Sequence, residues 1–277
     1  MQLPLKIFLC CHSSFDIIPP FAAAYQGGSA IHPPVEGAMG DVGEKGDISA
    51  KNKEYCELTV QYYAWKNEEF QSYGFCHYRR FFCFDEAVKK PYLAKKTLTG
   101  KEKKRYLKTE ADIERLIALQ DIITVRKEKT ADTVYNYYCT APHQYKEDID
   151  LFIEILKEKY PHLSAACDKY MNGSSQYFCN MFIMSREYFF SYCEMLFDIL
   201  ACFDEKKQLH GDFQADRTDG YLAERFLGIF ITYAYDNGAR IKELPRIDTH
   251  CTLKKRVIYH LLPPESRLRL FLKKRFS

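Results

Sequence analysis

Two adjacent arginines, Arg79 and Arg80, are the residues of this sequence best suited to binding an anion. They follow an aromatic-rich, strand-like run at residues 70–76, and His77 stands beside them. A guanidinium is a planar, permanently charged fork that matches phosphate oxygens two at a time. Because α/β folds place ligands in the loops that follow strands, this segment predicts a site for a phosphorylated small molecule.

Each of these side chains also has a purely structural interpretation. Either arginine could form a surface ion pair with a nearby acid, such as Asp85 or Glu86. A histidine at this position could equally be held at the strand end by hydrogen bonds to the backbone. We favour anion binding for the arginine pair, whereas the residues alone leave the role of His77 open.

Glu224 is the best candidate for a general base. It lies just inside an apolar helix expected at residues 221–235, where a carboxylate would deprotonate an acceptor hydroxyl. A salt bridge from Glu224 to Arg225 or Arg217 is the competing interpretation, and both stay open. If Glu224 is the base, the acceptor hydroxyl attacks a carbon atom of the other substrate and inverts the configuration of that carbon.

The elements that must position these residues alternate along the chain. Strands are expected at residues 6–11, 70–76, 121–125 and 178–184, and helices at residues 53–67, 112–119, 146–160, 186–203 and 221–235. Residues 26–49 are rich in Gly, Pro and Ala and are expected to form a functional or a mobile loop. This alternation, with no visible repeat, predicts an α/β fold with a mainly parallel central sheet flanked by helices.

Composition narrows the class of protein. The 277 residues are 47% hydrophobic, enough for a sizeable core, and the net charge of +3 is too small for a protein that wraps nucleic acid. The eleven cysteines include no Cys-x-x-Cys pair, and many lie at apolar positions, so we expect reduced thiols in the cytoplasm and no structural zinc. No uninterrupted apolar run approaches the roughly 18 residues that span a bilayer.

Charge is concentrated at the end of the sequence. After Pro245 basic residues dominate, which predicts one domain at residues 1–246 and a basic, amphipathic tail at residues 247–277. Residues 254–277 could lie on an anionic membrane surface, or form a helix packed on the domain. Membrane contact would place the protein at the inner face of the cell membrane, and the sequence favours neither interpretation.

Several sequence blocks resemble a known family. The blocks are Tyr55-Cys56-Glu57-Leu58-Thr59, Trp65-Lys66-Asn67, Tyr73-Gly74-Phe75-Cys76-His77-Tyr78-Arg79-Arg80, Asp121-Ile122-Ile123, Asp148-Ile149-Asp150 running to Pro161, Asn180-Met181-Phe182-Ile183-Met184 and Leu222-Ala223-Glu224-Arg225. In this order, over roughly residues 5–245, they resemble bacterial capsular and exopolysaccharide biosynthesis glycosyltransferases with the "HYRR" motif. The resemblance rests on the order of the blocks, since any one of them would be weak support.

The resemblance implies a GT-A-like fold and a hexosyltransferase that uses a nucleotide diphosphate sugar, with uridine as the expected nucleoside. The acceptor would be a surface polysaccharide or a lipid-linked oligosaccharide, and Glu224 would be the catalytic base. Asn180 is expected to contact the acceptor. The residues expected to bind the donor are His12, Asp47, Asn52, Lys66, Asn67, His77, Arg79 and Arg80.

Many GT-A enzymes hold a divalent metal, manganese or magnesium, with an Asp-x-Asp motif at a strand end. Here His77 and the arginines take that place, and Asp148-Ile149-Asp150 instead opens the helix at residues 146–160, where acids meet the positive helix end. We therefore assign no metal ligands and expect cationic side chains to stabilise the departing diphosphate. Recruitment of a cation by Asp47 or Asp121 stays open.

The sequence leaves two alternative functions open. Residues 78–82 combine basic and aromatic side chains, as in modules that bind single-stranded nucleic acid by stacking and charge. The low net charge and the apolar strand before them speak against this reading. A catalytically inactive nucleotide-binding relative is the other alternative. The only tryptophan, Trp65, is expected to fill the core rather than stack on a ligand.

Overall fold

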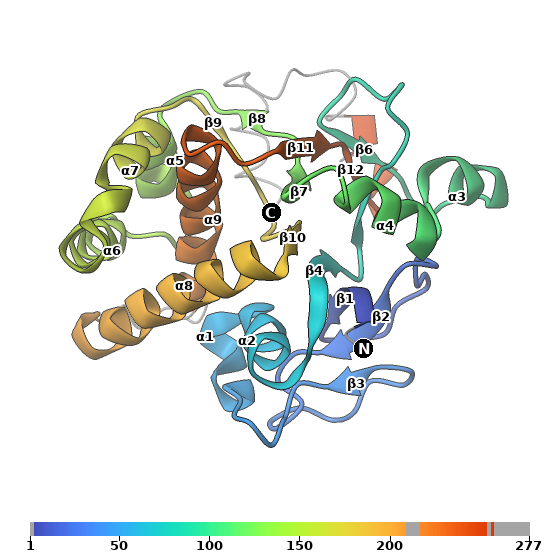
Figure 1. Ribbon diagram of the computed structural model, residues 1–277, viewed down its shortest axis with the longest axis horizontal. Coiled ribbons are helices and arrows are strands. Elements are labelled where there is room, and N and C mark those ends of the chain that lie inside the picture. The colour runs from blue at the N-terminus through green and yellow to red at the C-terminus, as the bar shows by residue number, and fades with distance from the viewer. Residues whose placement is uncertain (1–2, 209–216, 254–255, 258–277) are drawn as a thin grey trace.

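The computed structural model describes residues 3–208, 217–253 and 256–257 and shows a mixed α/β fold, a central sheet flanked by helices (Figure 1). This confirms the fold class predicted from the alternating pattern. Most of the predicted basic tail, residues 254–255 and 258–277, lies outside the described residues.

The main path of the sheet contains seven strands, and all but one run parallel. In spatial order they are β11 (Ile241–Leu244), β7 (Ile122–Val125), β10 (Phe182–Ser185), β4 (Phe70–His77), β1 (Leu3–Cys11), β2 (Ala23–Gln26) and β3 (Met39–Gly40). The exception is β10, which runs antiparallel to β4 and to β7. The β-branched and aromatic content of these runs suits strands that are buried on both faces.

Three short strands extend the sheet beyond β4. They are β5 (Arg80–Phe82), β12 (Arg246–Asp248) and β6 (Tyr92–Ala94), with β12 pairing to both of the others. The predicted domain boundary after residue 246 thus falls inside β12, within the sheet. A separate two-stranded sheet joins β8 (Glu128–Lys129) to β9 (Ser175–Gln176).

The helices cover the sheet. They are η1 (Ser49–Lys51), α1 (Asn52–Tyr55), α2 (Leu58–Asn67), α3 (Gly100–Tyr106), α4 (Glu110–Ile117), α5 (Val134–Thr140), α6 (Lys146–Lys159), η2 (Pro161–Leu163), α7 (Ser164–Met171), α8 (Arg186–Lys206) and α9 (Thr218–Asp236). Those expected at residues 112–119, 146–160, 186–203 and 221–235 are present as α4, α6, α8 and α9, whereas η1, α3, α5, η2 and α7 were not predicted. One prediction differs: the helix expected at residues 53–67 is broken at Cys56, whose φ of 50° interrupts it between α1 and α2. Local periodicity could not show this break.

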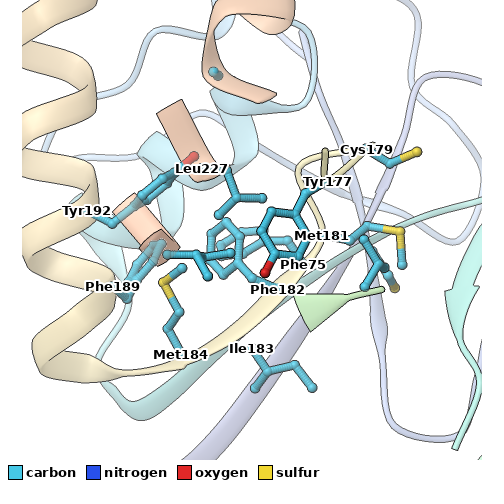
Figure 2. Close-up of a cluster of buried hydrophobic side chains, with 14 of the residues drawn as sticks. Phe75, Tyr177, Cys179, Met181, Phe182, Ile183, Met184, Phe189, Tyr192 and Leu227 are labelled. Atoms are coloured by element: carbon cyan, nitrogen blue, oxygen red, sulfur yellow. The ribbon is translucent and has the colours of Figure 1, made fainter. Parts of the chain in front are cut away.

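An aromatic core holds β4, β10 and α8 together (Figure 2). Phe75 of β4 contacts Phe182 of β10 with ring centroids 5.2 Å apart, and Phe182 contacts Tyr192 of α8 at the same separation. All three side chains are buried. Packing of this density resists small displacements, so the strand ends that leave the core are held in fixed relative positions.

The antiparallel direction of β10 decides where its first residues lie. Because Phe182 pairs with Phe75, the residues just before β10 lie beside the end of β4, at the edge where β1 and β4 also end. Cys179 and Asn180 occupy this position with φ values of 77° and 34°, a region that non-glycine residues rarely adopt. The chain therefore makes a tight, left-handed turn at the carboxyl edge of the parallel strands.

Candidate functional site

A cleft of about 840 Å³ opens at this carboxyl edge of the sheet. Its lining residues are Cys10, Cys11, His12, Gly27, His32, Pro33, Asn52, Lys53, Cys56, Glu57, His77, Tyr78, Arg79, Arg80, Cys179, Arg217, Gly220, Tyr221 and Glu224. The cleft matches the place where open α/β sheets bind ligands, outside the carboxyl ends of the strands. It brings together residues from both ends of the described chain.

The predicted anion-binding segment forms one wall of the cleft. The Arg79 guanidinium carbon lies 4.6 Å from the ring centroid of Tyr78, and the Tyr78 hydroxyl lies 3.2 Å from Nε2 of His12. Burial, followed by the nearby Arg79 charge, lowers the pKa of His12. His12, Tyr78 and Arg79 therefore form a connected shelf at the ends of β1 and β4.

The turn that carries the arginines is supported from behind by β12. The Arg79 carbonyl oxygen accepts hydrogen bonds from the backbone N–H of Thr249 (2.8 Å) and from its hydroxyl (3.1 Å). Asp248 pairs in register with Arg80, and Asp248 itself binds the buried Arg246 at 2.6 Å. This support lies beyond residue 246 and could not be read from the local sequence of the turn.

The expected structural partners of the arginines are engaged elsewhere. Asp85 binds Arg105 at 2.6 Å, and Glu86 binds Lys242. Within residues 3–208, 217–253 and 256–257, no ion pair engages the guanidinium of Arg79 or Arg80. Both side chains line the cleft, and their positive charges are available to bind an anion.

Two further cations that the sequence interpretation missed also line the cleft, Lys53 and Arg217. Arg217 precedes α9, and its Nε donates to the sulfur of Cys56 at 3.3 Å. With Arg79 and Arg80, four cationic side chains face one cavity. An anionic ligand is the class that such a cavity attracts.

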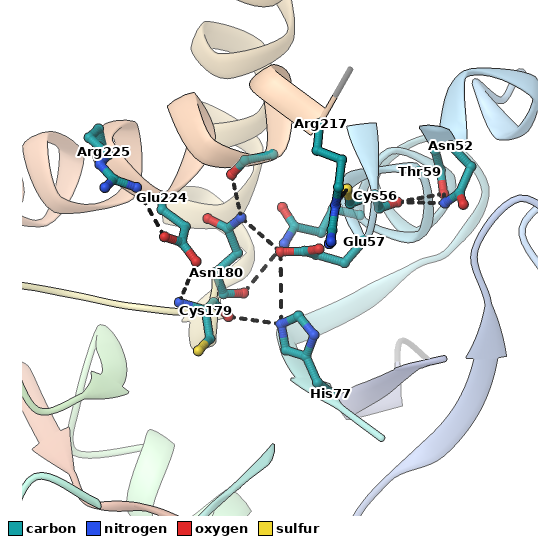
Figure 3. A network of polar contacts seen from close by, with 12 residues as sticks. Asn52, Cys56, Glu57, Thr59, His77, Cys179, Asn180, Arg217, Glu224 and Arg225 are labelled. Carbon is teal, nitrogen blue, oxygen red and sulfur yellow. Dashed lines mark hydrogen bonds and ion pairs between the residues drawn. The ribbon is translucent and has the colours of Figure 1, made fainter. Parts of the chain in front are cut away.

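Glu224 reaches the cleft from the second turn of α9 (Figure 3). Its Oε1 accepts the backbone N–H of Cys179 at 2.8 Å, and its Oε2 accepts from Arg225 at 3.1 Å. Burial raises the pKa of Glu224, and Arg225 offsets only part of that rise. The ion pair considered from the sequence is thus present, and the same carboxylate still faces the cleft.

His77 is held by the turn before β10. Its Nε2 donates to the carbonyl oxygen of Cys179 at 2.9 Å and lies 3.8 Å from Oε1 of Glu57 (Figure 3). Burial lowers the pKa of His77, and the nearby carboxylate of Glu57 offsets only part of that fall. The backbone-bound histidine considered from the sequence is what the structure contains, on the wall of the cleft.

The other predicted contact residues divide into two groups. Asn52 lines the cleft while its amide donates to the carbonyl of Cys56 at 2.7 Å, which supports the break between α1 and α2. Asn180 is buried beneath the cleft and does not line it; its amide nitrogen donates to Oε1 of Glu57 at 2.9 Å. The structure thus gives Asn180 a carboxylate partner rather than open space for an acceptor.

Three predicted donor-binding residues lie outside the cleft lining. Asp47 accepts the backbone N–H of Ser49 at 3.1 Å, and Asn67 bonds the backbone of the same loop region at Lys45 and Gly46. The ammonium of Lys66 lies 3.4 Å from the ring centroid of Trp65. All three serve the packing of the loop and of α2, and Trp65 itself stacks on Phe197, as the core interpretation expected.

The loop at residues 26–49 contributes His32 and Pro33 to the lining of the cleft. Its first turn is tied to the buried carboxylate of Asp41, which accepts the backbone N–H groups of Gly28 (2.8 Å) and Ser29 (2.9 Å). Gly28 has a φ of 73°, which explains the glycine. The loop is thus tied to the fold by hydrogen bonds and contributes residues to the cleft lining.

Glu57 was the most important residue that the sequence interpretation missed. It belongs to a block that carries the family resemblance, Tyr55-Cys56-Glu57-Leu58-Thr59. Because a continuous helix was expected there, the sequence did not indicate which way its side chain points. The break at Cys56 turns its side chain into the cleft. The signal that could have identified Glu57 is its carboxylate inside a block that carries the family resemblance.

The acidic residues considered as metal ligands are engaged in the fold. Asp121 binds Arg240 through both of its oxygens, and Asp148 and Asp150 open α6, as predicted. Among the described residues, three carboxylates lie close enough to one another to hold a cation, and they lie outside the cleft: Glu54, Asp204 and Asp219. The ammonium of Lys207 contacts all three, at 3.2, 2.6 and 3.2 Å, so the cluster already has a cation.

Two broader observations bear on the alternatives. Phe81 and Phe82 are fully buried, so they offer no ring for stacking on a nucleic-acid base. All eleven cysteines lie among the described residues and none forms a disulfide. Within the part of the chain that the structure describes, no helix combines the length and the apolar character needed to cross a membrane.

A family model described as "Domain of unknown function (DUF4422)" matches residues 6–235. A solved structure described as the apo form of WbbM, a bifunctional glycosyltransferase, is similar with a TM-score of 0.81 and 28% sequence identity. The match covers 89% of this chain and 45% of the WbbM chain, so this chain spans less than half of that protein. No curated protein matches the sequence.

Proposed function

This chain belongs to the DUF4422 family, and we propose that it is a glycosyltransferase that moves a sugar from a nucleotide diphosphate donor to a glycan acceptor. One observation carries the proposal: Arg79 and Arg80 line the same cleft as Glu224, a partly buried carboxylate with a raised pKa. An inverting sugar transfer uses a base to accept the proton of the acceptor hydroxyl, and fixed positive charge can stabilise the departing diphosphate. The structural similarity to WbbM supports sugar transfer in general.

The donor diphosphate binds at the wall formed by Arg79 and Arg80, and Arg217 lines the same cleft. Planar guanidinium groups hold phosphate oxygens in pairs, and they keep their charge at every physiological pH. The nucleoside, which we assign as uridine, lies along the shelf of His12 and Tyr78. A half-enclosed shelf with an aromatic ring and an imidazole suits a base and its ribose.

In the chemical step the acceptor hydroxyl oxygen forms a bond to the anomeric carbon of the donor sugar. The bond between that carbon and the diphosphate oxygen breaks, and the nucleoside diphosphate leaves with both bonding electrons. Glu224 accepts the hydroxyl proton, and the arginines stabilise the charge that develops on the leaving group. A single displacement of this kind inverts the anomeric centre.

The finer assignments follow the sequence resemblance. We propose a hexose as the transferred sugar and a capsular or other surface polysaccharide, or its lipid-linked oligosaccharide precursor, as the acceptor. Such an acceptor would place the enzyme in the cytoplasm, at the inner face of the cell membrane. The basic residues 254–277 would then contact anionic lipid.

The experiment that tests the function incubates purified protein with a panel of nucleotide sugars and measures nucleoside diphosphate release, with and without a chelator. We expect release from a uridine-linked hexose, and thermal protection by uridine diphosphate. Release that persists with chelator supports charge stabilisation by the arginines, and release that the chelator stops assigns that task to manganese or magnesium. No release from any donor together with no protection by any nucleoside diphosphate would overturn the proposal.

A further inference from the structure

Building on the proposed function, we propose that Glu57 is a substrate-binding carboxylate that accepts a hydrogen bond from a sugar hydroxyl, and that Asn180 is the positioning residue that aims it. The charged groups of the cleft would then divide by sign. The arginines would hold the diphosphate, and the carboxylates would meet the hydroxyl groups of the sugars.

The carboxylate of Glu57 is held by one oxygen and leaves the other open. Oε1 accepts from the amide of Asn180 at 2.9 Å and lies 3.8 Å from Nε2 of His77. Within the described part of the chain, no other residue gives Oε2 a hydrogen bond, and the backbone N–H of Glu57 itself also stabilises the carboxylate. The side chain is 15% exposed and lines the cleft.

Glu57 is partly buried, and a ligand group that donates a hydrogen bond to its second oxygen would stabilise the carboxylate. Sugars are rich in neutral hydroxyl donors, and a hydrogen bond to a charged acceptor is among the stronger ones in proteins. A diphosphate, in contrast, would be repelled by the negative charge of Glu57. The ligand group that fits the open oxygen is therefore a sugar hydroxyl.

The group that aims Glu57 is the left-handed turn before β10. The carbonyl oxygen of Cys179 accepts from His77, and its N–H donates to Glu224. Asn180, the next residue, donates both to Glu57 and to the carbonyl oxygen of Gly220 at 3.3 Å. One dipeptide thus fixes three side chains that come from α9, from the end of β4 and from the break between α1 and α2 (Figure 3).

The electrostatics of Glu57 agree with this role. Burial opposes its charge, but His77 and the amide of Asn180 together lower the pKa of Glu57 below its usual value. It therefore presents an ionised acceptor at neutral pH. The ionisable groups that interact with it are Cys10, Cys56, His77, Tyr192, Arg217 and Glu224.

The first test uses Glu57→Gln in the full chain. Glutamine keeps the acceptor for Asn180 but removes the charge, so uridine diphosphate should bind within about twofold of wild type. Transfer from the best donor of the panel should fall at least tenfold in kcat/KM. The matched control is Glu54→Gln, three residues earlier on α1, which pairs with Lys207 outside the cleft and should stay within about twofold.

The outcomes separate this inference from the function on which it rests. A wild-type protein that transfers sugar, together with a Glu57→Gln variant of unchanged kcat/KM, would overturn the role of Glu57 and leave the glycosyltransferase proposal intact. A wild-type protein that uses no donor overturns the proposed function instead. Equal loss of uridine diphosphate binding and of transfer in Glu57→Gln would also count against the division of the cleft by charge.

The second test concerns Asn180. Asn180→Gly suits the positive φ of this residue and removes only the amide, so the backbone turn should persist. Because the amide favours the charged form of Glu57, its loss raises the pKa of Glu57, and activity should be lost at a higher pH on acidification. A purely structural role would lower activity by the same factor at every pH. Adding Asn180→Gly to Glu57→Gln should cause no such shift in the pH profile of activity. A shift that persists in this double variant overturns the positioning role of Asn180.

Discussion

Nε2 of His77 donates a 2.9 Å hydrogen bond to the carbonyl oxygen of Cys179, which joins the end of β4 directly to the turn that begins β10. The two residues are far apart in the sequence, and each is held by its own strand in the same buried core. This contact sets the distance between the arginine-bearing turn and the Cys179 N–H that holds Glu224. The cationic wall and the base of the cleft are therefore parts of one rigid arrangement.

Replacing the arginines should weaken binding of the nucleoside diphosphate. Hydrogen bonds to charged groups contribute about 1.5–3 kcal/mol, so Arg79→Ala and Arg80→Ala should each raise the Kd for uridine diphosphate by roughly 10- to 100-fold. Arg79→Lys keeps the charge but loses the planar guanidinium, so its Kd for uridine diphosphate should lie between those of wild type and Arg79→Ala. Calorimetric titration measures these constants. Lys104→Ala, an exposed cation on α3, is the control, and an equal loss in that variant would indicate a diffuse charge effect.

Replacing the base should separate binding from chemistry. Glu224→Gln keeps an oxygen for the N–H of Cys179 but cannot accept a proton. We expect uridine diphosphate affinity within about twofold of wild type and a fall in kcat of about 10²- to 10⁴-fold, the usual contribution of general base catalysis. Initial rates at saturating donor give kcat. Turnover that is unchanged in this variant removes Glu224 from the mechanism.

Ionisation of Asp219 should contribute to the pH dependence of the free energy of unfolding. Burial, opposed by Lys207, raises the pKa of this fully buried carboxyl from 3.8 to about 7. Between these values the folded state holds a proton that the unfolded state has released, so this group makes the protein less stable as pH rises from about 4 to about 7. Asp219→Asn should lack that contribution.

Urea denaturation of wild type and Asp219→Asn across this pH range checks the sign. The free energy of unfolding of wild type relative to the variant should decrease as pH rises, and the difference should level off above pH 7. A difference that stays constant, or that increases with pH, would show that Asp219 is ionised throughout. Carboxyl groups that do not interact with Asp219 cancel in the comparison because both proteins contain them.

Gly228 should not tolerate a side chain. A Cβ at this position of α9 would come within 1.9 Å of the ring of Tyr170, a buried residue of α7 whose hydroxyl accepts the N–H of Tyr177 at 3.0 Å. Overpacking of this kind costs about 1–3 kcal/mol, so Gly228→Ala should lower the free energy of unfolding by that amount. Gly100→Ala is the control, because a Cβ there meets nothing within 4 Å. Its stability should be unchanged or slightly higher.

Much of the scaffold could be predicted from local patterns. Alternating strands and helices indicated the α/β class because apolar periodicity reflects burial directly, and α6, α8 and α9 begin within a few residues of their predicted starts. The arginines after an apolar strand indicated the anion-binding edge. Resemblance in ordered blocks then indicated the function, which composition could not do.

Other features depended on pairings between distant segments. No local pattern shows that β10 runs antiparallel between parallel strands, yet this direction alone brings Cys179 and Asn180 to the edge where β4 ends. The same holds for β12, which supports Arg80 from beyond the predicted domain boundary. Periodicity describes which face of an element is buried, and not which element it meets.

The sequence by itself determined the inventory of this protein: the elements, the adjacent arginines and the carboxylate at Glu224. Only the tertiary structure decided which polar groups share the cleft, because a hydrogen bond such as that from Asn180 to Glu57 joins residues brought together by sheet order. It also decided their charge states, since burial and neighbouring groups fix a pKa and both are properties of the folded chain.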